Sequence, residues 1–432
     1  MPRTSLLYRI GLGMSLPLVP VAGLFDAKIR RSHPARRRAL REFQQWGATS
    51  RDPARPLIWF HAPSVGEGLQ ARPVLARLRA RHPDWQFAYT FFSPSAEGFA
   101  RKSGADVSGY IPYDTARMAK LLLDALRPSA LVFAKLDLWP ELATRAAARG
   151  IPPGLIAGTV RPRSSRLRWP ARQLLRPGYA ALSLAGAISD ADRARLSELG
   201  CRPETLRVLG DPRFDSVIDV VRAAPEDDPL KAFGHGAPTM VAGSTWPGDE
   251  AVLLEAFARL HVRRPTARLI LVPHEPTPAH LAQIDRLAAR FGLSAPVRSS
   301  AAGGPVPLLV VDQIGILARL YGAGTMAFVG GGFHGRGLHS VLEPAAWGIP
   351  SVFGPRWEES RDASLLLEAG GAEALAELGA VEAAGVLENL WEDWIVNEIR
   401  RKAQGRKAYG VVQQGLGAAD RTADAVETLV IG

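Results

Sequence analysis

The stretch from Ala327 to Pro355 reads AFVGGGFHGRGLHSVLEPAAWGIPSVFGP, which is the pattern of a strand, a glycine-rich turn and a helix. Residues 327–329 are a short apolar run typical of a buried parallel strand. Residues 330–332 are all glycine, and residues 340–347 form a predicted helix that ends before Pro350. Backbone N–H groups can approach an anion closely where no Cβ intrudes, and a helix N-terminus favours negative charge. This stretch therefore predicts an anion-binding turn.

Glu343 lies one turn into that predicted helix. A carboxylate there cannot help to bind a phosphate, but it can accept hydrogen bonds from both hydroxyls of a ribose. The alternative interpretation is a tight turn in an ordinary α/β domain, for which the glycines alone would suffice. Glu343 shifts the balance towards a nucleotide site.

Short apolar runs alternate with amphipathic helical stretches on both sides of this region. Residues 57–60, 86–91 and 130–133 are predicted strands with helices between them, and the alternation restarts at residue 240. Residues 223–238 are rich in Pro, Gly and acidic residues and indicate a linker. The sequence predicts two Rossmann-like α/β domains with parallel sheets, facing a cleft. They are predicted to span residues 46–222 and 239–432, the second carrying the terminal helices.

Composition limits the classes of protein to consider. The chain has 432 residues, of which 47% are hydrophobic and 22% charged, as in a globular protein. Cys201 is the single cysteine, which excludes an internal disulfide and a thiolate metal cluster; we interpret it as a small buried residue. The nine histidines show no metal-ligand spacing, so we predict no metal and no cofactor.

Positive charge is concentrated near the N-terminus. The net charge is +11, and residues 1–60 contain eleven Lys and Arg against three Asp and Glu, which gives +8. Most of these cations lie in residues 28–41, directly after the uncharged residues 10–25. We predict that residues 1–45 anchor the chain in the cytoplasmic leaflet of a membrane, with the basic residues facing anionic lipid. The alternative is a buried helix with a solvated charged neighbour. This distribution argues against a nucleic-acid partner.

Three motifs follow predicted strands in the first domain. Glu67, in HAPSVGEG (61–68), is a candidate general base, or else a charge that stabilises a helix N-terminus. Asp137, in KLDLWP (135–140), is a second carboxylate for the same site, or else a helix cap. Arg213, in GDPRFD (210–215), is placed to meet an anionic substrate, or else forms a surface ion pair.

Two further motifs follow strands of the second domain. The sequence GSTWPG (243–248) predicts another anion-binding turn before a helix. His274, in PHEP (273–276), is predicted to face the same cleft, although a lone histidine is more often structural.

These motifs, in this order, resemble the 3-deoxy-D-manno-octulosonic acid (Kdo) transferases of lipopolysaccharide synthesis, most closely the branch found in Bacteroidetes. The matching blocks are HAPSVGEG, KLDLWPEL, TVRP, GDPRFD, VAGSTWPGDE, VPHEP and FVGGGFHGRGLHSVLEPAAWGIPSVFGP. The resemblance implies the two-domain architecture of GT-B glycosyltransferases. The first domain would hold a lipid acceptor and the second would hold CMP-Kdo.

The resemblance also implies roles for individual residues. Glu67 matches the catalytic base of the family, and Asp137 and Arg213 match residues thought to stabilise the transition state. The positions implied to contact CMP are His274, Glu275, Ile314, Gly315, Ile316, Ser340, Val341, Leu342 and Glu343.

Three positions depart from the family pattern. Ser340 replaces an Asn, Asp137 replaces a Glu, and Ile316 stands where many members have Glu. None of these changes removes the implied base.

The implied activity is an inverting, metal-independent transfer of Kdo from CMP-Kdo to the lipid A precursor lipid IVA. Such a lipid IVA Kdo transferase would work at the inner-membrane surface, with CMP-Kdo as substrate rather than cofactor. The alternatives are another nucleotide-sugar glycosyltransferase, a nucleotide-sugar epimerase of the same fold, or a non-catalytic membrane-bound protein that has kept the fold.

Overall fold

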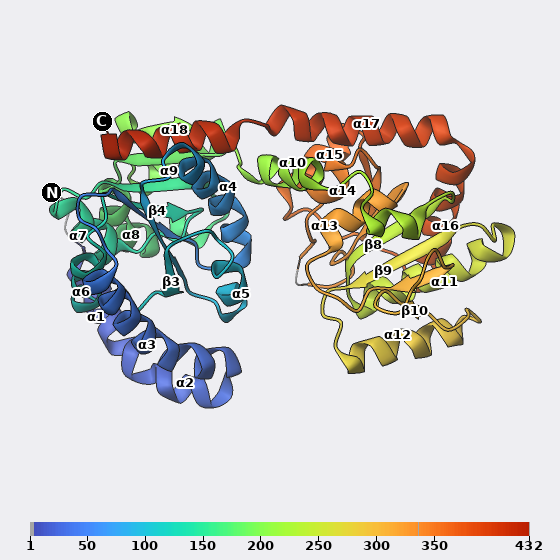
Figure 1. Cartoon of the computed structure of the whole chain (residues 1–432), viewed down its shortest axis with the longest axis horizontal. Coiled ribbons are helices and arrows are strands. Elements are labelled where there is room, and N and C mark those ends of the chain that lie inside the picture. Colours follow the sequence, from blue (N-terminus) through green and yellow to red (C-terminus); the bar gives the residue numbers. More distant parts are fainter. Residues whose placement is uncertain (1–3, 336, 432) are drawn as a thin grey trace. The chain divides into compact units, whose positions relative to one another are not determined.

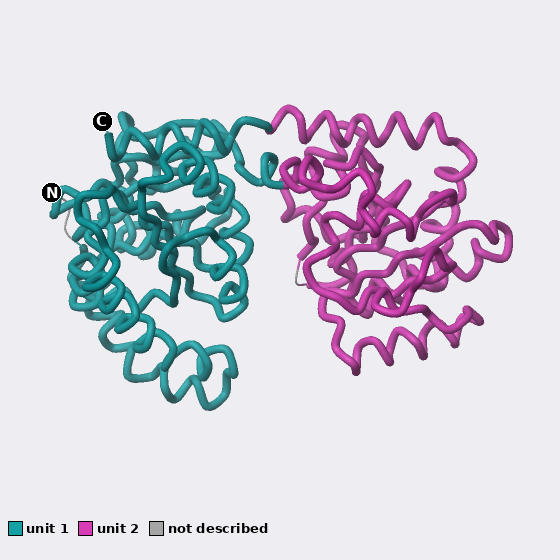
Figure 2. Tube along the Cα trace, viewed as in Figure 1, with its two compact units in different colours: residues 1–216, 416–432 teal, residues 217–415 magenta. Residues whose placement is uncertain are grey.

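The computed structural model describes residues 4–335 and 337–431. The chain forms two compact units (Figure 2). The first contains residues 1–216 and 416–432, and the second contains residues 217–415. The last helix of the chain, α18 (Ala418–Ile431), therefore packs with the first unit and not with the second.

The described strands of the first unit form one parallel sheet of seven strands in the order β3-β2-β1-β4-β5-β6-β7. Their bounds are β1 Leu57–His61, β2 Gln86–Phe91, β3 Val107–Tyr110, β4 Ala130–Ala134, β5 Pro153–Gly158, β6 Leu184–Ala187 and β7 Leu206–Val208. β1 and β4 are buried at every position, as expected for strands covered on both faces. The largest side chains of this core include Trp59, Phe60 and Phe133.

Helices cover both faces of this sheet (Figure 1). Their bounds are α3 Ala27–Thr49, α4 Val65–Arg81, α5 Glu97–Ala100, α6 Ala116–Leu126, α7 Pro140–Ala148, α8 Ala171–Ala180 and α9 Asp190–Leu199. α18 packs against α4, where Arg81 forms ion pairs with Asp420, Asp424 and Glu427.

The N-terminal segment consists of α1 (Leu6–Ser15), a 3-10 turn (Leu16–Leu18) and α2 (Val19–Phe25). By length and composition, Leu6–Phe25 is the one segment among the described residues that qualifies to cross a membrane, and only 6% of it is buried. Polar groups at its start bind α7. Thr4 Oγ1 lies 2.7 Å from Thr144 Oγ1, and Arg9 Nε lies 2.8 Å from Glu141 Oε2.

The basic residues of α3 are not all on the surface. We predicted that the cations of residues 28–41 face lipid, and for Arg36 this is wrong. Its side chain is buried, donates hydrogen bonds to the carbonyl oxygens of Ile111 and Phe92, and lies over the Phe92 ring. Arg31 forms an ion pair with Glu97. Part of the N-terminal charge therefore holds the first unit together.

The second unit repeats the architecture, with its described strands in the order β10-β11-β9-β8-β12-β13-β14, all parallel. The strand bounds are β8 Thr239–Thr245, β9 Arg268–Pro273, β10 Val297–Arg298, β11 Leu308–Val310, β12 Met326–Val329, β13 Ser351–Phe353 and β14 Ala372–Ala374. The helices are α11 Pro247–Arg263, α12 Pro278–Arg290, α13 Leu317–Leu320, α14 Leu342–Ala346, α15 Arg361–Glu368, α16 Ala380–Val396 and α17 Glu398–Gly415. α10 (Arg213–Ala223) begins in the first unit and continues into the second.

Candidate functional site

The carboxyl ends of β1 and β4 bring two of the predicted motifs together in the first unit. The strands are adjacent and parallel, with His61 opposite Phe133. Because the two strands are parallel, they end at the same edge of the sheet. The turn that begins α4 therefore meets the loop that begins at Lys135. Lys135 has φ 62°, in the left-handed region that non-glycine residues rarely adopt. Such backbone strain clusters at functional sites.

Glu67 lies in the first turn of α4, with 15% of its side chain exposed. Ser64 Oγ donates a hydrogen bond to Oε2, and Lys135 Nζ lies 3.1 Å from Oε1. Burial acts to raise the pKa of Glu67, but the Ser64 hydrogen bond and the Lys135 cation outweigh it, so the pKa lies below the usual value. Glu67 is therefore ionised at neutral pH, the form that accepts a proton.

Asp137 lies in the loop that begins at Lys135, and it contacts a buried histidine. Its Oδ2 is 3.5 Å from Nε2 of His61, which is fully buried on β1. Trp139 Nε1 donates to Asp137 at 3.4 Å, and Arg166 lies 3.9 Å away. Burial acts to raise the pKa of Asp137, yet His61, Trp139 and Arg166 together hold it below the usual value. Asp137 is thus a second anionic carboxylate at these strand ends.

Arg213 begins α10 and forms an ion pair with Asp211. Its Nε and Nη2 donate hydrogen bonds to Asp211 Oδ2 at 3.0 Å and 2.7 Å. Asp211 is buried and also accepts a hydrogen bond from Gln70 of α4 at 3.4 Å. Burial acts to raise the pKa of Asp211, but Arg213 holds it below the usual value. The guanidinium is thereby fixed relative to α4, the helix that carries Glu67.

In the second unit, the glycine-rich turn after β12 is built differently from the prediction. We predicted that its N–H groups are open to an anion, and for Gly330 and Gly331 this is wrong. Gly330 donates its N–H to the Gly243 carbonyl oxygen, and Gly331 donates to Asp249 at 2.9 Å. A Cβ on Gly330 would collide with the Ser244 carbonyl oxygen. These two glycines allow close backbone packing within the protein.

Asp249 also closes the turn that follows β8. It accepts a hydrogen bond from Trp246 N–H at 2.9 Å in addition to the one from Gly331. Burial nevertheless raises its pKa to about 6, because the carboxyl is almost fully removed from water. Asp249 thus accepts one N–H group from each of the two predicted anion-binding turns.

Glu343 lies on α14, which covers only residues 342–346 of the predicted helix 340–347. Val341 and Leu342 are buried, whereas Ser340 is partly exposed. Burial raises the pKa of Glu343 to about 7, although the residue as a whole keeps some exposed surface. Within the described residues, the carboxyl group has no hydrogen-bond or ion-pair partner. Its acceptor capacity is unused by the protein.

His274 belongs to an aromatic cluster at the end of β9. Its ring stacks on Trp246 with a centroid distance of 4.7 Å and lies 4.6 Å from the ring of His339. Trp246 Nε1 donates to Nε2 of His339 at 3.2 Å. Burial, followed by the nearby His274 and His334, lowers the pKa of His339 to about 4. The His339 ring is therefore neutral at physiological pH, as an acceptor requires.

The remaining predicted contact positions lie on loops of the same unit. Glu275 follows His274 and is exposed, and its carbonyl oxygen lies 2.9 Å from His280 Nδ1. Ile314 is 83% exposed, Gly315 has φ 90°, and Ile316 precedes α13. Across the part of the chain that the structure describes, no group of three or more His, Cys, Asp or Glu is arranged to hold a metal ion.

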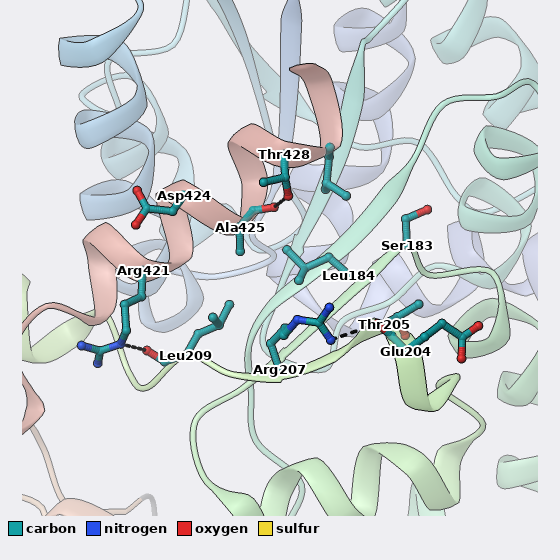
Figure 3. Close-up of a pocket in the computed structure, with 11 residues that line it drawn as sticks. Ser183, Leu184, Glu204, Thr205, Arg207, Leu209, Arg421, Asp424, Ala425 and Thr428 are labelled. Carbon is teal, nitrogen blue, oxygen red and sulfur yellow. Dashed lines mark hydrogen bonds between the residues drawn. The ribbon is translucent and has the colours of Figure 1, made fainter. Parts of the chain in front are cut away.

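The structure also has a cavity of about 440 Å³ in the first unit, between β6–β7 and α18 (Figure 3). Arg207 and Arg421 line it, and Arg421 Nε donates to the Leu209 carbonyl oxygen. None of the predicted site residues lines this cavity. The candidate site is therefore defined by the strand ends and not by this cavity.

Several residues of the candidate site were missed in the sequence. Ser64, Lys135 and His61 surround the predicted carboxylates, and all three lie inside the quoted motifs HAPSVGEG and KLDLWP. Asp249 lies in VAGSTWPGDE, but only the fold shows that it reaches the turn after β12. His339 likewise meets His274 only through the packing of two distant loops.

Comparisons of the sequence with known proteins agree on one family. The family model described as 3-deoxy-D-manno-octulosonic-acid transferase matches residues 37–216. The 3-deoxy-D-manno-octulosonic acid transferase of Bordetella pertussis is 30% identical over 421 residues, which cover 90% of this chain and 94% of that protein. The corresponding transferase of Haemophilus influenzae is 24% identical and covers 85% of this chain and 86% of that protein.

Solved structures with the same fold include a UDP-GlcNAc 2-epimerase from Neisseria meningitidis bound to UDP-GlcNAc. It has a TM-score of 0.62 and 13% identity, and the match covers 87% of this chain and all of that chain. A similar protein from Listeria monocytogenes, described as a putative UDP-N-acetylglucosamine 2-epimerase, has a TM-score of 0.61 and 12% identity, with 87% of this chain and 96% of that chain covered. At such low identity these matches show the fold alone. The predicted α/β fold with GT-B architecture is confirmed.

Proposed function

The chain belongs to the Kdo transferase family, and from this premise we propose that it transfers Kdo from CMP-Kdo to lipid IVA with inversion at the anomeric carbon. In this proposal the first unit binds the lipid acceptor and the second unit binds the donor. Glu67 acts as the general base. The observation that carries the proposal is the pair of ionised carboxylates, Glu67 and Asp137, at the ends of adjacent strands.

The proposed reaction begins when a hydroxyl of the acceptor sugar approaches Glu67. The hydroxyl gives its proton to the carboxylate as its oxygen forms a bond to the anomeric carbon of Kdo. The bond from that carbon to the CMP phosphate oxygen breaks, and CMP leaves with the electron pair. Attack opposite the leaving group inverts the configuration.

The neighbours of Glu67 support this role. Ser64 and Lys135 keep the carboxylate charged although it is mostly buried. Lys135 is 47% exposed, so it can move aside without a large desolvation cost when the acceptor arrives. Asp137 and Arg213 bring further fixed charges to the same unit, where they would stabilise charge that develops during transfer.

In the second unit, Glu343 supports nucleotide binding. Its carboxyl group lies in a desolvated environment without a partner among the described residues, which suits an acceptor for the two ribose hydroxyls of CMP. His274, Glu275, Ile314, Gly315, Ile316, Ser340, Val341 and Leu342 are the other proposed CMP contacts.

We further propose that the enzyme works at the cytoplasmic face of the inner membrane, and that Leu6–Phe25 lies along the membrane surface. Polar contacts fix the start of this segment to α7, and α3, which follows it, packs against β3 of the same unit. Both ends are thus tied to one unit, whereas Leu7, Met14 and Phe25 are exposed to meet lipid.

The test is incubation of the full-length protein with CMP-Kdo and lipid IVA, followed by mass spectrometry of the lipid. We expect the lipid mass to increase by one or more Kdo residues, with release of CMP. A lipid of unchanged mass would contradict the proposal. So would an isomerised nucleotide sugar formed without any lipid, which would indicate an epimerase.

A further inference from the structure

One segment of the first unit is strongly basic, and apart from Arg166 its arginines have no role in the site described so far. Residues 161–176, RPRSSRLRWPARQLLR, contain six arginines and no acidic residue. The acid-free region is wider, because no Asp or Glu occurs between Glu141 and Asp190. This segment joins β5 to α8 and includes the first residues of α8.

The fold holds this basic segment beside Asp137. Arg166 Nη2 lies 3.9 Å from Asp137 Oδ1. Just beyond the segment, α8 packs against α7, and a Cβ on Gly178 would be only 3.0 Å from the Cα of Pro140. The segment therefore lies next to the loop and the helix that follow β4.

The outward-facing arginines of this segment are available for a ligand. Arg163, Arg168 and Arg172 are exposed, and none of them forms an ion pair with any residue that the structure describes. Trp169, between two of them, is 81% exposed. The basic helix α3 also carries exposed cations, but two of its arginines are used within the protein, because Arg31 is paired with Glu97 and Arg36 is buried.

We propose that residues 161–176 bind a phosphate monoester on the lipid acceptor and so hold the acceptor sugar next to Glu67 and Asp137. This inference rests on the proposed function, because it names a binding subsite for the acceptor of that reaction. The planar guanidinium matches two phosphate oxygens at once, and several such groups suit a doubly charged monoester better than a single carboxylate. An exposed tryptophan beside them is typical of a protein surface at the level of lipid head groups.

The position relative to the N-terminal segment fits a lipid ligand. α7 contacts both the basic segment, through α8, and the start of the apolar segment, through Thr144 and Glu141. Both α8 and α1 therefore contact α7, and the three helices lie in the same part of the first unit (Figure 1). A lipid whose acyl chains lie in the membrane can place its phosphate against α7.

The test combines Arg163→Gln, Arg168→Gln and Arg172→Gln in the full-length protein. Its matched control combines Arg286→Gln, Arg290→Gln and Arg406→Gln, which removes the same charge from exposed positions of the second unit. We expect the KM for lipid IVA, a phosphorylated lipid, to rise by at least about tenfold in the first variant only. We expect kcat and the KM for CMP-Kdo to stay within about twofold of wild type, because these arginines do not touch the donor.

Two further arms identify the ligand. On lipid IVA from which the phosphates have been removed, the wild type and the variant should have the same KM. Flotation with phosphatidylcholine–phosphatidylglycerol vesicles should show equal membrane binding for both proteins. An unchanged KM for intact lipid IVA would overturn the inference, as would an equal rise on the dephosphorylated lipid. A parallel loss of vesicle binding would also overturn it, because it would indicate general contact with anionic membrane.

Direct binding of lipid IVA in detergent micelles, without donor, keeps this test separate from that of the proposed function. If the wild type binds the lipid through its phosphates but transfers no Kdo, the proposed function fails and the subsite stands. If the wild type transfers Kdo and the variant binds lipid IVA normally, the subsite fails. A variant that combines Arg163→Lys, Arg168→Lys and Arg172→Lys keeps the charge but not the planar guanidinium. Its KM for lipid IVA should lie between those of the wild type and the glutamine variant.

Discussion

Glu67 in the first unit and Glu343 in the second occupy similar places in the fold, yet their surroundings are opposite. Each lies in the first turn of a helix that follows a strand of a parallel sheet. Glu67 receives a hydrogen bond from Ser64 and the charge of Lys135, so its pKa is lowered in spite of burial. Glu343 receives nothing from the described residues, and burial raises its pKa to about 7.

The difference shows that the role of a carboxylate at a strand end is decided by its neighbours and not by the backbone. A carboxylate that the protein keeps charged can act on a substrate proton as soon as the acceptor binds. A carboxylate without a partner is costly to ionise until a ligand supplies hydrogen-bond donors. In this account, Glu67 is prepared for chemistry and Glu343 for binding.

The largest effect is expected at Glu67. Glu67→Gln keeps the shape of the side chain but removes the proton acceptor, so kcat should fall by about a hundredfold to ten-thousandfold. The measurement is the rate of CMP release in the presence of lipid IVA. Glu198→Gln, on the exposed face of α9, is the control. A folded Glu67→Gln protein that retains most of the turnover would reject Glu67 as the base.

Glu343 should affect donor binding rather than the chemical step. Each hydrogen bond from a ribose hydroxyl to a charged acceptor contributes about 1.5–3 kcal/mol, so Glu343→Gln should weaken CMP binding by about tenfold to a hundredfold. Isothermal titration calorimetry measures this, with the exposed Glu368→Gln as control. Equal affinity for the wild type and Glu343→Gln would show that the carboxylate does not contact the nucleotide.

The same residue predicts a pH dependence. Only the ionised form of Glu343 accepts both hydroxyls, so the affinity of the wild type for CMP should rise as pH rises through about 7. The contribution of Glu343 to folding stability changes with pH in the opposite direction. A folded-state pKa above the unfolded value means that stability is lost as pH rises towards about 7. In Glu343→Gln, the CMP affinity and the folding stability should both change less with pH.

Asp249 is expected to stabilise the two glycine-containing turns of the second unit. Asp249→Ala removes the acceptor for the Gly331 and Trp246 N–H groups and leaves these donors buried. The free energy of unfolding should fall by about 1–3 kcal/mol, as measured by denaturant titration. Added sulfate should restore part of the loss by replacing the missing anion. A variant as stable as the wild type would show that this carboxylate does not hold the turns closed.

Lys135 should give the smallest effect. Lys135→Met removes the cation that lowers the pKa of Glu67, so the acidic limb of the pH–rate profile should move to higher pH. The rate at neutral pH should change by less than about tenfold, since partly exposed ion pairs contribute about 0–1 kcal/mol. Lys120→Met, at an exposed position of α6, is the control. An unchanged acidic limb would mean that Glu67 does not determine it.

The sequence predicted the longer central strands well and several of the shortest strands not at all. β1, β2 and β4 are mostly apolar, and their bounds match the prediction to within one residue. β7, β13 and β14 have only three residues each and were not predicted, because so short a run has no measurable period. α8 was missed as well, since two prolines and several arginines hide its apolar face.

The candidate site was predictable only as far as single motifs extend. Glu67, Asp137 and Arg213 stand out because charged residues after apolar runs are conspicuous. Lys135 lies in the motif KLDLWP, but it was not predicted as a site residue, because a surface lysine has no distinctive sequence pattern. The hydrogen bond from Gly331 to Asp249 was not predictable, since the two residues are distant in the chain and meet only in the folded unit.

The most direct test of the central comparison is a carbon NMR titration of the Glu67 and Glu343 carboxyl groups in the wild type, assigned with Glu67→Gln and Glu343→Gln. We predict a pKa below the usual glutamate value for Glu67 and one near 7 for Glu343. If both carboxyl groups titrate at the usual value, or if their order is reversed, the two sites do not differ as proposed here.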